Sequence, residues 1–340
     1  MSGRTLRWLM SLARRSGRHG RNGGAAARLT IIRHHRVYAD DERPLYRLGV
    51  SERVFAEQLG MLVSLGLTPV SAAEGWRRLA ERRPGNRVAM TFDDGYADNA
   101  GRALRHLLSA SAGATFYLTA GLMDERHAPW WDVLAHALEK TRAPRLDWSV
   151  GDRRFDLPLE SRADRVRALH RLLPALGVAP VERARRLAEI RDRLAVLEAV
   201  PCELMDWEAA GALARAGMEV GAHSLDHPLL SLLPADSQRR EIAGSIELIE
   251  RRLGIRPVGF AYPGGDYDAV TLEAAAACGL EYAVTTRPGL NLPGASCHEL
   301  RRRGLSEGAC LGPSGRFSRR LAMAELEGAF DRLRRAEVAS

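Results

Sequence analysis

Two short motifs in this 340-residue chain combine residue types that can bind a metal ion and activate water. The first, Thr91 to Gly95, ends an apolar run with two adjacent carboxylates, Asp93 and Asp94. The second, His223 to His227, places two imidazoles four positions apart after another apolar run. One carboxylate and two histidines form a facial ligand set that suits zinc and leaves positions open for water and substrate. The other carboxylate could act as a base on that water, so the motifs together predict metal-assisted hydrolysis.

Each motif has a simpler explanation when it is taken alone. Adjacent aspartates before a glycine are common in turns, because aspartate accepts backbone hydrogen bonds and glycine tolerates positive φ. Two histidines at i and i+4 are often surface or capping residues. The aspartate pair could also serve a glycosidase, but adjacent residues rarely face each other across a bond at the required ~5–9 Å. A glycosidase would also leave both histidines without a role, so we favour metal-assisted hydrolysis.

Composition and charge exclude several classes of protein. The chain is 46% hydrophobic, which is enough for the core of one large domain or two small ones, and no apolar run is long enough to span a membrane. The net charge is +8, but residues 1–28 hold seven arginines and no acidic residue. The remainder is therefore near neutral, which argues against a nucleic-acid groove. We expect residues 1–28 to form a disordered, solvated tail, with contact to an anionic membrane surface as the alternative.

The cysteines and the amino-terminal residues indicate in which cellular compartment the protein is expected. The four cysteines, at positions 202, 278, 297 and 310, predict neither a zinc knuckle nor a disulfide framework, and they suit a reducing compartment. Arginines interrupt the short apolar stretch near the amino terminus, so it does not predict a signal peptide. We expect a cytoplasmic protein, or one peripheral at the inner face of the membrane.

Alternating strand and helix patterns predict how the two motifs are positioned. Strands are expected at 29–32, 67–70, 87–92, 114–118, 218–222, 258–262, 282–286 and 300–305, with helices between most of them, as at 72–82, 99–108, 237–253 and 268–278. This alternation predicts a mostly parallel sheet. The aspartate pair and the histidine pair each follow a strand. Since the carboxyl ends of strands converge on one face of a closed α/β barrel, we expect a site there.

Residues 123–201 interrupt this alternation and predict a mostly helical insertion. Amphipathic patterns rich in arginine and leucine predict helices at 162–173 and 181–197, and 146–157 predicts a small hairpin. Trp130 and Trp131 begin a helical segment of the insertion. They could stack on a sugar as a lid, or pack the core of the insertion itself.

The motifs resemble those of the polysaccharide deacetylases of the NodB homology type. Thr91 to Gly95 resembles the first motif of that family, His223 to His227 the second, and Phe260 to Gly265 a variant of the third. The similarity covers residues 29–305, and the layout resembles the branch found with bacterial exopolysaccharide and cell-surface glycan synthesis. The resemblance implies a distorted (β/α) barrel at 29–310 with the helical insertion, preceded by the tail and followed by a helix or tail at 311–340.

The resemblance also implies metal-dependent removal of N-acetyl, and sometimes O-acetyl, groups from sugars. Carried over to this chain, Asp94, His223 and His227 would bind the metal ion. Zinc is the first expectation, with cobalt, nickel or manganese as alternatives. Asp93 would be the general base. Tyr262 to Gly264 would line the wall that binds the acetyl group, with a backbone N–H near Gly264 contacting the oxyanion.

The chain departs from the family pattern in two places. The third motif often begins with an arginine that orients the catalytic aspartate, and Ala261 stands there instead. We expect Arg302 to replace it, with Arg287 as the alternative. The late Leu-x-x-His motif, which supplies the general acid, is not visible, and His298 and His35 are the candidates. These departures leave a non-catalytic glycan-binding protein on the same fold as the alternative function, although the retained base favours an enzyme.

Overall fold

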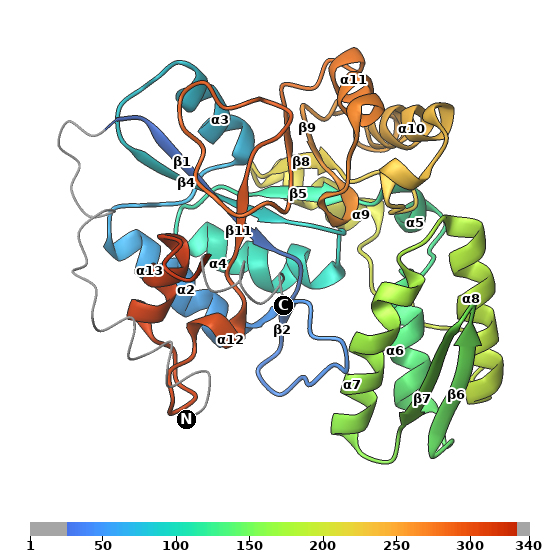
Figure 1. The fold of residues 1–340 in the computed structure, drawn as a ribbon. Helices are drawn as coiled ribbons and strands as arrows, with labels where there is room; N and C mark the ends of the chain where they lie inside the picture. Colours follow the sequence, from blue (N-terminus) through green and yellow to red (C-terminus); the bar gives the residue numbers. More distant parts are fainter. Residues whose placement is uncertain (1–25, 332–340) are drawn as a thin grey trace.

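The computed structural model describes residues 26–331, which build a nearly closed, seven-stranded parallel barrel (Figure 1). The strands follow the order β10-β9-β8-β5-β4-β1-β11 around the sheet. Their bounds are β1 Arg28–His34, β4 Asn86–Phe92, β5 Thr115–Leu118, β8 Glu219–Ala222, β9 Gly259–Ala261, β10 Tyr282–Val284 and β11 Arg302–Gly304. A parallel bridge between Val284 and Leu300 brings β10 close to the segment that leads into β11. The expected (β/α) barrel is therefore confirmed.

Successive side chains of each strand point in turn to the inside of the barrel and to the surrounding helices, because side chains alternate along a strand with a period of two residues. On β1, Leu29 and Ile31 lie in a buried cluster inside the barrel, whereas Ile32 packs in the larger cluster beneath the helices. By the same alternation Arg33 points to the inner side, at the carboxyl end of the strand. This end of the barrel carries both sequence motifs.

Helices connect the strands and cover the outside of the barrel (Figure 1). They are α2 Glu52–Ser64, α3 Ala72–Ala80, the π-helical η1 Asn99–Ala103, α4 Leu104–Ser109, α5 Ala120–Asp124, α9 Trp207–Arg215, α10 Ala235–Leu253 and α11 Ala269–Ala277, followed by α12 Glu307–Cys310 and α13 Arg319–Leu326. Short elements are β2 Val37–Tyr38, β3 Val50–Ser51 and the 3₁₀ turns η3 Leu230–Leu232 and η4 Pro263–Gly265. Within residues 26–331, no helix is both long and apolar enough to cross a bilayer.

The structure differs from the expected elements in two places. The strand expected at 67–70 is reduced to a single parallel bridge between Val70 and Ala89, because Pro69 has no N–H to offer to a ladder. The helix expected at 99–108 begins as the π-helical turn η1 and continues as α4. Most of the predicted tail, together with residues 332–340, lies outside the described residues, and Arg28 already belongs to β1.

A compact unit of helices and one hairpin lies beside the barrel (Figure 1). It comprises α6 Trp130–Lys140, the antiparallel strands β6 Arg145–Val150 and β7 Arg153–Pro158, α7 Arg162–Leu172, η2 Leu173–Leu176 and α8 Pro180–Leu194. The unit has its own buried core, in which Trp148 stacks on Phe155 with ring centroids 5.2 Å apart. Trp130 packs against this core, whereas Trp131 does not belong to it. The helical insertion thus places α6 at the edge of the barrel mouth.

Candidate active site

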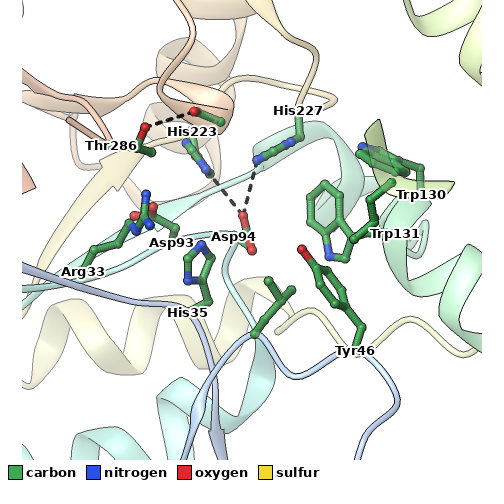
Figure 2. Close-up of a pocket in the computed structure, with 13 residues that line it drawn as sticks. Arg33, His35, Tyr46, Asp93, Asp94, Trp130, Trp131, His223, His227 and Thr286 are labelled. Carbon is green, nitrogen blue, oxygen red and sulfur yellow. Dashed lines mark hydrogen bonds and ion pairs between the residues drawn. The ribbon is translucent and has the colours of Figure 1, made fainter. Parts of the chain in front are cut away.

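Asp94, His223 and His227 converge at the carboxyl ends of β4 and β8 (Figure 2). Asp94 Oδ1 lies 3.4 Å from His223 Nε2 and 3.5 Å from His227 Nε2, and one ligand atom from each residue lies within 4.8 Å of the others. His223 Nδ1 lies 2.6 Å from the carbonyl oxygen of Ala261, which orients the ring so that Nε2 faces the other two groups. One carboxylate and two imidazoles at these distances fit a divalent ion such as zinc.

The protonation states of this cluster also suit a metal ion. Burial alone would raise the pKa of Asp94, but its hydrogen bond with His223 and the neighbouring imidazoles lower it. Burial, together with His223, lowers the pKa of His227 to about 3. Asp94 is therefore ionised and His227 neutral near pH 7, and these are the forms that bind metals.

The backbone at the cluster adopts an uncommon conformation. The φ angles of Asp94, Ser224 and His227 are +76°, +64° and +52°, in the left-handed region that non-glycine residues rarely occupy. Such conformations cost of order 1–3 kcal/mol each and concentrate at functional sites. Three of them at one cluster indicate that the surrounding structure imposes these side-chain directions.

Glu241 of α10 holds the loop between the two histidines. The backbone N–H groups of Leu225 and Asp226 donate to Glu241 Oε2 at 2.9 and 3.1 Å. The N–H of His227 donates to Ser224 Oγ at 3.0 Å. Sequence analysis missed Glu241, because a glutamate on an amphipathic helix has no local feature that marks its contact with a distant loop.

Arg302 binds Asp93 through both of its terminal nitrogens. Nη1 lies 2.6 Å from Oδ1 and Nη2 lies 2.7 Å from Oδ2, while Nε donates to the carbonyl oxygen of Thr285 at 2.9 Å. Burial alone would raise the pKa of Asp93, but the charge and hydrogen bonds of Arg302, together with His223 and His35, outweigh burial and hold that pKa below its usual range. Arg287, the other candidate, is exposed and lies over the ring of Tyr267 at 4.8 Å. The structure therefore brings Arg302, and not Arg287, to Asp93.

A cavity of about 490 Å³ opens above these groups, within the range of small-ligand sites. Besides the two motifs, its lining includes His35 after β1, Gly264 in η4, Thr286 after β10, and Trp130 and Trp131 of the insertion (Figure 2). Gly264 has a φ of +63°, so this turn depends on glycine at that position. The cavity thus joins residues from the barrel and from the insertion in one site.

Trp131 connects the insertion to the histidine cluster. Its ring meets that of His227 edge to face at a centroid distance of 4.5 Å. Its Nε1 donates to the Tyr96 hydroxyl at 2.8 Å, and that hydroxyl donates to Asp132 Oδ2 at 2.9 Å. Burial raises the pKa of Asp132 to about 7. Trp131 therefore supports a candidate metal ligand, while Trp130 both lines the cavity and packs against the insertion.

The structure does not bring Tyr262 or His298 into the cavity lining. Ala261 faces the inside of the barrel, so the next side chain, Tyr262, points outward into the core beneath the helices. The hydroxyl of Tyr262 donates to the carbonyl oxygen of His298 at 3.0 Å. The His298 ring lies 2.9 Å from the carbonyl oxygen of Leu280, which precedes β10, at the end of the strand opposite to the cavity. Of the segment from 262 to 264, only Gly264 lines the cavity.

His34 and His35 point to opposite sides of β1. The His34 ring packs against Phe55 and Phe92, with centroids 5.6 and 5.5 Å away. His35 faces the cavity, and burial lowers its pKa although the charge of Asp94 opposes the shift. Arg33 also lines the cavity. Sequence analysis did not single out Arg33, although its spacing of two from His35 was the available signal.

The fold and the site define a (β/α)-barrel protein with an aspartate–histidine–histidine cluster at the carboxyl ends of its strands. The chain belongs to the polysaccharide deacetylase family, whose sequence model matches residues 80–283. The resemblance inferred from the motifs is therefore confirmed.

Individual proteins and solved structures are also similar to parts or most of this chain. An uncharacterized protein of Streptomyces coelicolor, SCO4760, is 42% identical over 90 residues, which are 26% of this chain and 36% of that relative. The match thus spans about a third of the relative's length. The structure of Streptococcus pyogenes deacetylase PplD in complex with acetate has a TM-score of 0.57 at 18% identity, covering 86% of this chain and 97% of that one. IcaB from Ammonifex degensii has a TM-score of 0.54 at 22% identity, covering 82% and 91%. At these identities the two structures show a shared fold.

Proposed function

We propose that this protein is a metal-dependent hydrolase that removes acetyl groups, N-acetyl first of all, from a carbohydrate or glycan intermediate. One observation carries the proposal: the Asp94, His223 and His227 cluster lies in an open cavity beside a second carboxylate, Asp93, which Arg302 holds in place. Family membership supports the substrate class.

Asp94, His223 and His227 would hold the ion. Two imidazole nitrogens and a carboxylate oxygen favour zinc, and the same donors accept cobalt, nickel or manganese. Bound there, the ion would supply Lewis-acid polarisation of the acetyl carbonyl and would lower the pKa of water from about 15.7 toward ~7.

Asp93 is the candidate general base. Its lowered pKa keeps it ionised and ready to accept a proton from water. Arg302 occupies one site on each carboxylate oxygen, and since a carboxylate offers about four acceptor sites, capacity for the proton remains. Arg302 is thus a positioning residue that fixes the direction of Asp93.

Gly264 and His35 would act on the oxygen and the nitrogen of the acetamido group. The backbone at Gly264 lines the cavity, where an N–H could stabilise the oxyanion, and loss of such a donor typically costs ~10²–10³ in rate. His35 faces the same cavity and would protonate the leaving nitrogen. Because burial lowers its pKa, His35 must first take up a proton, and Asp93 is the source once it has accepted one from water.

The second candidate function is a non-catalytic glycan-binding protein on the same fold. Its main support is that Ala261 stands where family members often carry an arginine. The contact between Arg302 and Asp93 weakens that support, because a guanidinium reaches the carboxylate from another strand. We therefore favour the enzyme.

The metal content of the purified full chain, measured by elemental analysis, tests the proposal. We expect about one zinc, cobalt, nickel or manganese ion per wild-type chain and none in His223→Ala/His227→Ala. The matched control His127→Ala/His136→Ala, which changes two histidines outside the cavity lining, should keep the metal. Asp93→Asn should keep the metal yet lose acetate release from N-acetylated oligosaccharides. A wild-type chain without metal after reconstitution, or full activity in Asp93→Asn, would overturn the mechanism.

A further inference from the structure

Arg33 brings a positive charge to the cavity from the carboxyl end of β1. It lines the cavity beside Asp93 (Figure 2), yet it has no hydrogen-bond or ion-pair partner among residues 26–331. It lies opposite Gly304 in the pairing of β1 with β11, and its Nη2 is 3.7 Å from the place that a Gly304 Cβ would occupy. The missing side chain at Gly304 therefore leaves room for the guanidinium beside the cavity.

The two nearby carboxylates are already engaged. Asp93 is bound at both oxygens by Arg302, which also donates to Thr285 and is 1% exposed. Asp94 lies against the two histidines of the metal cluster. Arg33 and Arg302 thus provide two guanidinium groups against two carboxylates, before any bound ion adds its own charge. Once a divalent ion is bound, the site would carry an excess of positive charge. The guanidinium of Arg33 would then be the group that can bind an anion.

An unpaired guanidinium at this depth is unfavourable for the free protein. Burial and the like charge of Arg302 lower the pKa of Arg33, although Asp93 and Asp94 oppose the shift. Perturbed groups of this kind in a cavity mark functional sites. A guanidinium presents a planar fork of donors that matches the oxygens of a carboxylate or a phosphate.

We infer that Arg33 binds an anionic group, a carboxylate or a phosphate, carried by the acetylated sugar close to the acetyl group that is removed. This inference rests on the proposed function and narrows its substrate class from acetylated glycans to acidic ones. The anion would occupy the Arg33 side of the cavity, while the acetyl group lies over the histidine cluster.

Isothermal titration calorimetry tests this inference. It measures the equilibrium binding of sugar probes to the full-length, metal-loaded protein. The probes are N-acetylglucosamine, its 6-phosphate and N-acetylglucosaminuronic acid, so that the last two distinguish phosphate from carboxylate. We expect at least one anionic probe to bind the wild type about 10- to 100-fold more tightly than the neutral sugar, as charge-assisted hydrogen bonds allow. Arg33→Met should reduce that ratio to near one, and Arg33→Lys should keep part of it.

Arg256→Met is the matched control, because it removes one arginine that pairs with Glu250 outside the cavity lining. It should keep the wild-type ratio. A wild type that does not prefer either anionic probe would overturn the inference. So would a preference that persists in Arg33→Met, since the anion would then be binding elsewhere, such as on the metal.

Metal content and acetate release, measured on the same preparations, separate this inference from the proposed function. Anion binding that depends on Arg33, in a protein without metal or acetate release, would overturn the hydrolase and keep the anion site. Acetate release without an Arg33-dependent preference would overturn the anion site alone.

Discussion

Arg302 and Asp93 are 209 positions apart in the chain, yet each carboxylate oxygen of Asp93 receives its own guanidinium nitrogen at 2.6 and 2.7 Å. The two side chains are 1% and 3% exposed. The ion pair joins the end of β4 to β11, with β1 between them in the sheet, and it keeps the candidate base ionised. A structural contact and the proposed chemistry therefore depend on the same two residues.

Replacing Arg302 should change the pH dependence of activity as well as its size. Arg302 opposes the effect of burial on the pKa of Asp93, so this pKa should rise when that charge is removed. In Arg302→Met the acidic limb of the profile of kcat/KM against pH should therefore move to higher pH. Breaking the buried pair should also reduce the free energy of unfolding by about 3–5 kcal/mol.

Rate measurements from pH 4 to 9, combined with urea denaturation, check this prediction. Arg302→Lys, which retains a charge but not the two-pronged contact, should fall between wild type and Arg302→Met in both measurements. An unshifted acidic limb in an active Arg302→Met would show that Arg302 does not act through Asp93.

His35→Ala should slow the cleavage of amides more than that of activated esters. An amide leaving group needs a proton as the bond breaks, whereas a nitrophenolate leaves without one, and general acid catalysis typically contributes ~10²–10⁴ in rate. We expect kcat for an N-acetylated sugar to fall by about that factor, while kcat for 4-nitrophenyl acetate changes less than tenfold. Equal losses on both substrates would remove His35 from the role of acid. His298→Ala should leave both rates unchanged, since its ring binds the carbonyl of Leu280.

Glu241→Ala should weaken metal binding without touching a ligand. The N–H groups of Leu225 and Asp226 would lose their acceptor, and the loop that carries His227 would lose its fixed conformation. Outer contacts of this kind typically contribute 10- to 100-fold in metal affinity, and we expect a loss of that size in competition with a chelator. Glu241→Gln keeps an acceptor oxygen and should recover most of the affinity. If both variants bound metal as the wild type does, the loop would not depend on Glu241.

Asp132 should make stability fall as the pH rises. Burial raises its pKa to about 7, above the ~3.9 of an exposed aspartate, so the folded state binds this proton more tightly than the unfolded state. The contribution of Asp132 to the free energy of unfolding is therefore lost as the pH rises from about 4 to about 7. Asp132→Asn stays neutral and keeps an acceptor for the Tyr96 hydroxyl.

The stability of Asp132→Asn relative to wild type should increase by about 2 kcal/mol between pH 5 and pH 8, as measured by urea denaturation. Asp236→Asn is the matched control, because the Asp236 side chain is 94% exposed, and it should not show this change. The same difference from wild type at both pH values would mean that Asp132 titrates normally.

Local patterns were sufficient to predict the barrel and the convergence of Asp94, His223 and His227 at one end of it. Apolar runs ending in Asp93-Asp94 and in His223 predict strands with polar residues at their carboxyl ends, and those ends meet in any closed parallel barrel. The helical insertion is also visible locally, as a change in the period of apolar residues. These predictions succeed because they depend on chain direction and side-chain period, which neighbouring residues determine.

The remaining site residues depend on which strands become neighbours. Arg302 reaches Asp93, and Arg33 lies beside Gly304, because β11 pairs with β1 although nearly the whole chain lies between them. Tyr262 points away from the cavity because closure of the barrel turns Ala261 inward. The amino-acid sequence by itself determined the two motifs and the strand ends that carry them. Only the tertiary structure decided which arginine, which histidine and which loop contact complete the site, because barrel closure is a long-range property that no local period encodes.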